Sequence, residues 1–278
     1  MCNNSFFVQH NDPQYRNSEK CVRLCRAIAR DFHDILSPKG FIKCGVTYLR
    51  RHGNALLQYI TFSFNRASWD VEIQIGVVPL YQCPIGFWQR WLPGIRTVAG
   101  LGGYPMYRIA GIEDKRSAFC YSADYASTIA NDKDTLIKCI LPQLDEIRNA
   151  TDVLHFIKFD PMTSPVFPNI ALLLRAQKNT VVVNCLEKEI EIIEEHQKTV
   201  QRLFADGTIN NAALEYHRRF DEERMAFCQR LLPAVIHNDQ ECINIEFEAA
   251  INAAYRELVI YSKTFVAKYP QKTLLLTE

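Results

Sequence analysis

Two carboxylates on one predicted strand are the first residues whose types and spacing could do chemistry. Asp70, Glu72 and Gln74 alternate with apolar residues and therefore project from one strand face. Side chains two residues apart lie about 7 Å from each other, a spacing that suits a divalent cation or separate acid and base roles. A nuclease strand of this kind carries a lysine near the position of Gln74. The pattern therefore favours a solvated sheet face. A hydrolase or nuclease is the alternative, with a histidine from elsewhere and Arg50 or Arg51 as electrophilic partner.

A segment without helical or strand periodicity, residues 81–111, concentrates the residue types that dominate binding hot spots. It contains six of the eleven glycines together with Trp, Tyr and Arg side chains, namely Trp88, Arg90, Trp91, Arg96, Tyr104 and Tyr107. Loops on a rigid scaffold commonly carry recognition, and tryptophan and arginine combine contact area with directed donors. The segment predicts a surface for a protein partner. Packing of these aromatic residues on the end of the sheet is the structural alternative.

Nucleic-acid binding is a third interpretation. It would use Arg50, Arg51 and Arg66 beside Arg90 and Arg96, with the tryptophans stacking on bases. The formal net charge of +1 gives no overall basic field, so this interpretation is not favoured.

Metal and cofactor motifs are not found. The seven histidines are scattered without an HExxH pattern, and the P-loop spacing of Gly40 and Gly45 is followed by Val46 where lysine is required. Asp152 and His155 are three residues apart on a predicted helix and could share one face with a metal, but no second such pair is present, so an ordinary helix start at Asp152 and a surface His155 are favoured. The glutamate run at residues 187–195 predicts the outer face of an amphipathic helix. We expect no cofactor and no metal site.

Composition indicates a globular cytosolic chain. Of 278 residues, 48% are hydrophobic and 23% are charged, which is enough to build a core. The longest apolar stretches are about five residues, far below the roughly 20 that span a bilayer. The ten cysteines form no CxxC pair, and the first residues carry no export pattern. We therefore expect reduced thiols, a cytoplasmic location and no membrane contact.

Periodicity in the first half predicts a helix followed by antiparallel strands. Apolar residues recur at three and four over residues 17–37, and this helix should end before Pro38 and Gly40. Alternation predicts strands at residues 41–51, 55–64 and 70–77, with a turn at residues 52–54. A further hairpin is expected from residues 104–110 and 117–122.

Periodicity in the second half predicts helices. One begins near Asn131 and should be kinked by Pro142, and Thr151 is expected to cap a short helix through Phe159. Further helices are predicted at residues 170–177, 181–205, 209–232 and 242–269, connected as antiparallel hairpins. Three prolines within residues 160–168 place a boundary between an α+β domain at residues 1–160 and a helical domain at residues 161–278.

Three segments resemble the bacterial family called domain of unknown function 4304. They are GFIKCGVTYLRRHGNALLQYITFSFN at residues 40–65, the strand end IGVVP, and the later ILPQLDEI. In that family a helix precedes a strand, two further antiparallel strands and a helical close. The resemblance covers about residues 17–160 and implies a bacterial protein with this fold. It implies no catalytic residue. The helical tail from residue 168 is similar to variable extensions of such proteins.

These observations predict an α+β protein in which an N-terminal helix packs on an antiparallel sheet and an all-α helical-hairpin lobe follows. We expect a non-enzymatic binding module for a protein partner, and homo-oligomers are compatible with it. By analogy with small lineage-variable proteins, an immunity or defence accessory role is also expected.

Overall fold

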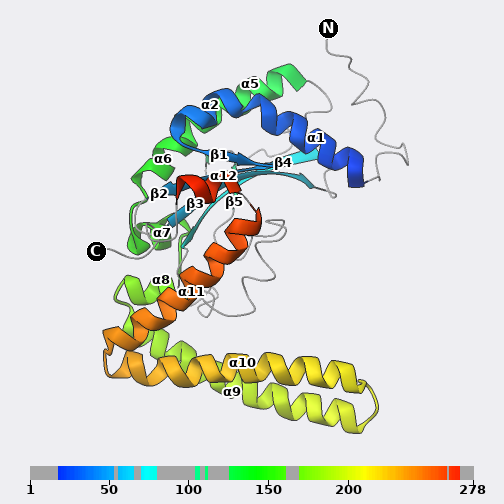
Figure 1. The fold of residues 1–278 in the computed structure, drawn as a ribbon, viewed down its shortest axis with the longest axis vertical. Coiled ribbons are helices and arrows are strands. Elements are labelled where there is room, and N and C mark those ends of the chain that lie inside the picture. The colour runs from blue at the N-terminus through cyan, green and yellow to red at the C-terminus, as the bar shows by residue number, and fades with distance from the viewer. Residues whose placement is uncertain are drawn as a thin grey trace.

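The computed structural model describes residues 18–52, 56–65, 70–79, 104–106, 110–111, 125–160, 169–261 and 263–269. Within these ranges the chain forms one antiparallel sheet covered by helices, followed by a helical region that extends away from it (Figure 1). The predicted α+β fold is confirmed. No helix in the described ranges has the length and apolar character needed to cross a membrane. The prolines of the predicted boundary, at residues 161–168, lie outside the described residues, so the division at residue 160 stays a prediction.

Among the described residues, the sheet has five strands in the order in which they occur along the chain. They are β1 (Ile42–Cys44), β2 (Thr47–His52), β3 (Leu56–Asn65), β4 (Asp70–Pro79) and β5 (Tyr104–Pro105). Every neighbouring pair is antiparallel. The long strands β3 and β4 pair over their whole length, from Leu56 opposite Pro79 to Asn65 opposite Asp70.

The single strand expected at residues 41–51 is wrong. The chain reverses at Gly45, which adopts a positive φ of 65°, and Cys44 pairs with Thr47. Only glycine takes this conformation without strain, and two-residue hairpin loops need it. The result is a short hairpin of β1 and β2. In the described part of the predicted strand at residues 104–110, Tyr104 and Pro105 pair with β4 and Met106 no longer belongs to the strand, so the strand is shorter than expected. Its predicted partner strand, residues 117–122, lies outside the described residues.

The N-terminal helix packs on the sheet, as predicted. The helix α1 (Ser18–Asp31) contacts β3, and the hydroxyl of Tyr48 on β2 donates a hydrogen bond to the carbonyl oxygen of Ala29 at 2.7 Å. The rings of Phe32 and Phe62 lie 4.9 Å apart. The short α2 (His33–Leu36) and the 3₁₀ turn η3 (Ser37–Lys39) follow, and the chain leaves through Gly40 at a φ of 84°.

Pro142 disturbs its helix as expected, and the form of the disturbance is a π-helical turn. The helix α5 (Tyr125–Thr135) continues into the π turn η5 (Leu136–Ile140) and then α6 (Leu141–Glu146). Proline cannot donate the backbone hydrogen bond that a regular helix requires. A π turn inserts one residue into the helix, so the buried side chains keep a four-residue spacing at Thr128, Asp132, Leu136, Ile140 and Leu144.

The cap predicted at Thr151 is two residues off. The helix α7 (Ala150–Phe156) begins after Asn149, whose side chain accepts a hydrogen bond from the backbone of Asp152. Asp152 Oδ2 accepts in return from the backbone N–H of Asn149 at 3.2 Å, which completes a capping box. Asp152 therefore acts as a helix-start residue, as the sequence indicated.

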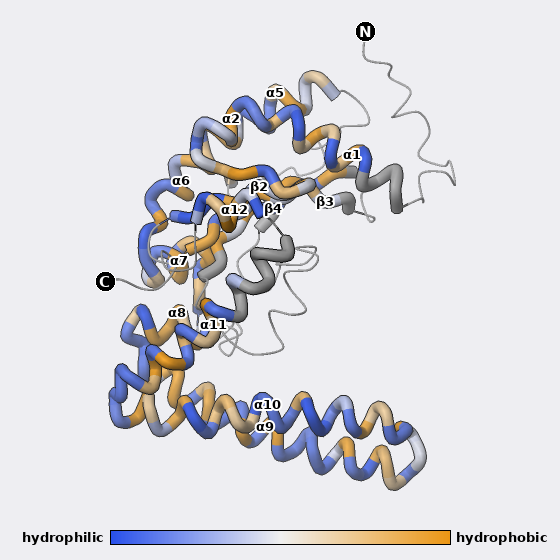
Figure 2. Tube along the Cα trace, in the orientation of Figure 1, coloured by the Kyte–Doolittle hydropathy of each residue, from blue (hydrophilic) through white to orange (hydrophobic). Residues whose placement is uncertain are grey.

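The C-terminal helices follow the predicted ranges except for the last one, because the structure has two helices where a single helix was predicted at residues 242–269. They are α8 (Ile170–Arg175), α9 (Asn179–Ala205), α10 (Asn211–Ile236), α11 (Gln240–Tyr261) and α12 (Lys263–Lys268). The antiparallel pair α9 and α10 contact each other along their lengths and form an arm that projects from the rest of the molecule (Figure 1). Hydrophilic and hydrophobic segments alternate along both helices of this arm (Figure 2).

Four helices end in the same backbone motif. After α7, α8, α9 and α10 the chain passes through a residue with positive φ, at Lys158, Gln177, Gly207 and Asn238. In each case the next residue donates its N–H to a carbonyl five residues back, as Lys178 does to Leu173 at 2.8 Å and Asp239 to Ala234 at 2.8 Å. This is the Schellman motif, whose left-handed position favours glycine.

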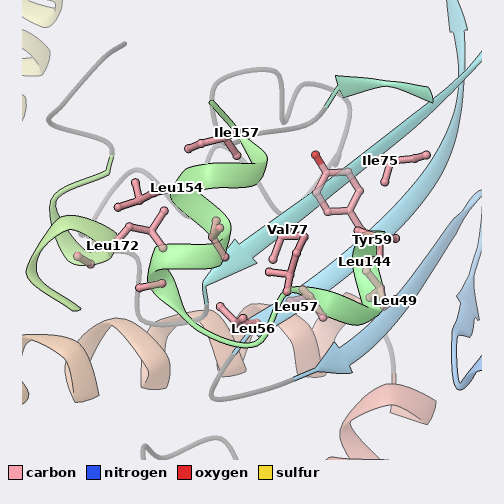
Figure 3. Packing of buried hydrophobic residues seen from close by; sticks show 14 of the residues in the cluster. Leu49, Leu56, Leu57, Tyr59, Ile75, Val77, Leu144, Leu154, Ile157 and Leu172 are labelled. Carbon is pink, nitrogen blue, oxygen red and sulfur yellow. The ribbon is translucent and has the colours of Figure 1, made fainter. Parts of the chain in front are cut away.

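One hydrophobic cluster runs from the sheet into the helical region. Figure 3 shows side chains of β2, β3 and β4 beside those of α6, α7 and α8, including Leu49, Leu57, Val77, Leu144, Leu154, Ile157 and Leu172. The sheet is buried on both faces over β2 and β3. Tyr48, Ile60 and Phe62 face α1, while Leu49, Leu57 and Tyr59 are equally buried on the opposite face.

Candidate functional site

Most of the predicted aromatic binding segment lies outside the described residues. This applies to Trp88, Arg90, Trp91, Arg96 and Tyr107. Tyr104 is placed only by its backbone, opposite Ile75, and Asp70 only by its backbone, opposite Asn65. The binding role of this segment stays a prediction.

Glu72 and Gln74 share a strand face and contact each other. Gln74 Nε2 donates a hydrogen bond to Glu72 Oε2 at 3.2 Å, and both side chains are half-buried. In the described part of the chain no histidine or lysine is bonded to Glu72, although a hydrolytic site would need such a group. The same part contains no group of three metal-ligating side chains. The enzyme interpretation therefore gains no support from this face.

Arg50 has a structural position rather than an exposed one. Only 6% of the residue is accessible, and its guanidinium donates from Nε and Nη2 to Gln58 Oε1 at 2.9 and 2.6 Å. Nη1 donates to the carbonyl oxygen of Lys39, and Nη2 lies 2.7 Å from Asp145 Oδ1. The charge expected to meet a substrate, a partner or a phosphate is thus engaged inside the protein, between the sheet and α6.

Arg51 lies on the opposite face of β2 from Arg50, so the two arginines do not form one site. Its Nε atom is buried and has no hydrogen-bond partner among the described residues. Burial lowers the pKa of Arg51, and the nearby Tyr269 opposes this effect. The predicted arginine pair is therefore divided between two sides of the sheet.

The arm contains a polar cluster in which Glu189 and Asp221 are buried and His196, His217 and Arg224 are half-buried. Arg224 forms an ion pair with Glu189 and lies 3.9 Å from Asp221 Oδ1, while His196 Nδ1 is 2.7 Å from Asp221 Oδ2. The ring of His217 packs edge-on against that of His196 at 5.3 Å. Asp221 is 1% exposed and Glu189 is 8% exposed. The expectation that the whole glutamate run faces solvent is therefore wrong for Glu189.

Cysteine thiols follow this cluster towards the base of the arm. Burial raises the pKa of Cys185 on α9 and of Cys228 on α10 to about 11 each. The positive charge of Arg224 opposes the shift at Cys228. Both thiols are free, and at neutral pH both are protonated and act as apolar packing groups.

Large apolar side chains are exposed on the arm just outside the polar cluster. Ile192, Tyr216 and Phe220 are 46%, 53% and 37% exposed. Tyr216 and Phe220 are one helical turn apart, and Ile192 lies one turn before His196, which packs against His217. Antiparallel pairing of α9 with α10 therefore brings the three side chains to one side of the arm.

A cavity of about 530 Å³ lies where the arm joins the rest of the helices. Its wall contains four carboxamides, Gln177, Asn179, Asn238 and Gln240, and Gln240 Nε2 donates to Asn238 Oδ1 at 3.0 Å. Arg175 also lines it, with the guanidinium carbon 4.7 Å from the centre of the Phe247 ring. Sequence analysis missed this site, because its residues come from two chain reversals about 60 residues apart.

The chain matches no family model, and neither a curated protein nor a solved structure is similar to it.

Proposed function

We propose that this chain is a non-enzymatic, cytosolic binding protein whose arm docks a helix of a protein partner. One observation carries the proposal: Ile192, Tyr216 and Phe220 are exposed on α9 and α10, the two helices of the projecting arm (Figure 1). Exposed aromatic side chains that are grouped rather than scattered are typical of interaction surfaces.

The arm favours a helical ligand. Two antiparallel helices leave a groove along their seam, and a third helix can bury apolar residues there at spacings of three and four. Tyr216 and Phe220 are four residues apart on α10, and Ile192 is exposed on the neighbouring α9. The two helices are firmly connected, because ion pairs and hydrogen bonds between Glu189, Arg224, Asp221 and His196 join them.

The charged residues around these apolar side chains fit the polar rim of a protein interface. Arg219 Nε lies 3.2 Å from Glu223 Oε1, and Arg218 Nε lies 3.4 Å from Glu222 Oε1. Charges that are neutralised within their own helix cost little to place at the edge of an interface. The apolar centre would therefore provide the affinity.

A cytosolic location is part of this proposal. The described cysteines with defined side chains, Cys25, Cys44, Cys139, Cys185, Cys228 and Cys242, are all free thiols, which suits a reducing compartment. We also keep the resemblance to the domain of unknown function 4304 family as a proposal. The order of a helix followed by antiparallel strands over residues 18–79 supports it.

A photo-cross-linking amino acid at Tyr216 tests the docking surface. The matched control is the same amino acid at Gln201, which is exposed on the other side of the arm. We expect the Tyr216 position to cross-link one defined protein in cytosol and the Gln201 position not to. The captured protein is then purified, and its affinity is compared for wild type, Tyr216→Ser with Phe220→Ser, and Gln201→Ala.

The double variant should bind at least tenfold more weakly, which corresponds to about 1.4 kcal/mol, and Gln201→Ala should bind like wild type. Equal cross-linking from both positions would contradict the proposal, as would unchanged affinity of the double variant. Cross-linking to a second copy of this chain would identify self-association as the function of the surface.

A further inference from the structure

We infer that the partner of the docking surface, which consists of Ile192, Tyr216 and Phe220, is a second copy of this chain. The two arms pair side by side about a two-fold axis. This inference rests on the proposed function, because it uses the same surface and names the occupant of that surface.

The exposed aromatic residues of the arm continue an apolar stripe that is buried at the base of α10. Apolar side chains recur at spacings of three, four and seven residues and therefore share one face of this helix, namely Tyr216, Phe220, Phe227, Leu231 and Ala234. The last three of these are buried, whereas Tyr216 and Phe220 are exposed. The same stripe thus changes from core to surface between Phe220 and Phe227.

The helix α11 runs beside the buried part of this stripe. It contacts α10, and its Glu246 forms an ion pair with Arg230 of α10 at 2.7 Å. From there α11 diverges from the arm towards the sheet, and within the described ranges the arm projects beyond it as two helices (Figure 1). The exposed part of the stripe is therefore the continuation of a helix–helix interface that already exists at the base.

The spacing of the two aromatic residues is complementary to itself. Tyr216 and Phe220 are one helical turn apart, and neighbours on α10 orient their rings, with His217 at 5.6 Å from the first and Arg224 at 5.0 Å over the second. When two α10 helices pair antiparallel about an axis midway between these residues, Tyr216 of each copy lies beside Phe220 of the other. One symmetric contact therefore forms the aromatic pair twice.

The charges beside the docking surface permit contact between identical surfaces. A surface with an excess of one sign repels its own copy, because a two-fold axis brings like charges together. Arg219 lies 3.2 Å from Glu223 on α10, and Lys198 lies 3.7 Å from Glu195 on α9. Each of these cations has its counter-charge within its own copy, so pairing of two arms leaves these charges balanced.

Two paired arms provide the helices that one arm lacks. A two-helix hairpin has an apolar side that further helices must cover, and two antiparallel hairpins place four helices around one core. Each arm meets its copy as a firm unit, because the ion pair of Glu189 with Arg224 and the contact of His196 with Asp221 connect α9 to α10.

Sedimentation equilibrium of the full chain tests this inference. From about 1 to 200 μM, wild type should show a monomer–dimer equilibrium with a Kd below about 50 μM. Tyr216→Ser with Phe220→Ser should weaken dimerisation at least tenfold, and Ile192→Ser on the other helix about threefold or more. The matched control, Gln201→Ala, changes an exposed residue outside the docking surface and should dimerise like wild type.

The two-fold arrangement is tested by mixing chains of different isotopic mass. Unlabelled chains with the photo-cross-linking amino acid at Tyr216 are mixed with heavy-isotope-labelled wild type, and joined peptides are mapped by mass spectrometry. We expect cross-links between light and heavy chains, attached within one helical turn of Phe220. Attachment around residues 211–216 instead would mean parallel arms and would overturn the antiparallel arrangement.

A wild-type chain that is monomeric throughout the concentration range overturns the inference. Dimerisation of the double variant and of Ile192→Ser as tight as that of wild type overturns it as well. These failures are distinct from failure of the proposed function. If the chain is monomeric but the Tyr216 position cross-links a different protein in cytosol, only the second copy is excluded. If that position captures no protein at all, the docking surface is excluded too.

Discussion

Gln58 Oε1 accepts two hydrogen bonds from Arg50, from Nε at 2.9 Å and from Nη2 at 2.6 Å. The amide nitrogen of the same Gln58 donates to the carbonyl oxygen of Leu144 at 2.6 Å, and His52 Nε2 lies 3.1 Å from that of Asp145. Two strands thus provide donors for the last carbonyls of α6, which the helix itself leaves without partners. Arg50 and Gln58 together fix the end of that helix on the sheet.

Arg50→Met should be much more destabilising than Asp145→Asn. The arginine is buried, and its loss leaves Gln58 Oε1 without a donor in the interior, which costs about 1–3 kcal/mol in addition to lost packing. The side chain of Asp145 is 43% exposed, so water replaces its ion pair and the expected cost is below about 1 kcal/mol. Urea unfolding of both variants measures the difference. Equal losses would contradict the assigned role of Arg50.

Gly76→Ala should be destabilising because of Tyr59. A Cβ atom at Gly76 would lie 2.5 Å from the hydroxyl oxygen and 2.6 Å from two ring carbons of the fully buried Tyr59. Such overpacking costs about 1–3 kcal/mol. Thermal unfolding of Gly76→Ala and of Gly76→Ala with Tyr59→Leu measures the effect, and the smaller side chain should recover part of the loss. Additive effects of the two substitutions would show that the ring is not the cause.

Tyr59→Phe is the control for this pair. The hydroxyl of Tyr59 is buried without a hydrogen-bond partner among the described residues, and burial raises its pKa. Removal of an unsatisfied polar group is expected to leave the free energy of unfolding unchanged or to raise it by about 1 kcal/mol. A clear loss of stability would mean that the hydroxyl has a partner.

Lys133 and Asp34 give a pH-dependent contribution to stability. The hydrogen bond from Lys133 lowers the pKa of Asp34 below its ordinary value of 3.8, and the pair connects α5 with α2. A carboxyl group whose pKa is lower in the folded state than in the unfolded state stabilises the protein at pH values above the unfolded-state pKa. This stabilisation is lost as the pH falls through the folded-state pKa. We expect Lys133→Met to remove part of the stability difference between about pH 6 and pH 3. An identical pH profile in wild type and variant would contradict the assignment.

Asp221→Leu should destabilise the arm. Asp221 is 1% exposed and interacts with His196 and Arg224, so its removal leaves buried polar groups incompletely paired. Breaking such a group costs about 3 kcal/mol. Glu222→Leu, at an exposed neighbouring position, is the control and should change stability by less than about 0.5 kcal/mol. Hydrogen exchange of the α9 and α10 amides locates the loss.

The sequence predicted elements wherever one periodicity governed a segment. The long helices near residues 181–205 and 209–232 were found because an apolar stripe persists over many turns. The sequence did not predict the chain reversal at Gly45, because apolar and polar residues keep alternating on both sides of that turn. Glu189 could have been recognised, since it lies three residues after Leu186 and four before Ile193 on the apolar stripe. The cavity could not have been recognised from the sequence, because helix periodicity does not say which chain reversals lie next to each other in the fold.

The arm acts geometrically as a lever. At 1.5 Å per residue, the 27 residues of α9 extend about 40 Å from the cavity at its base to the turn at Gly207. A rotation of about 10° at the base would displace the far turn by about 7 Å over this length. Small changes in the packing of the α8–α9 and α10–α11 connections are therefore magnified at the tip, where a bound protein would experience them as a change of position.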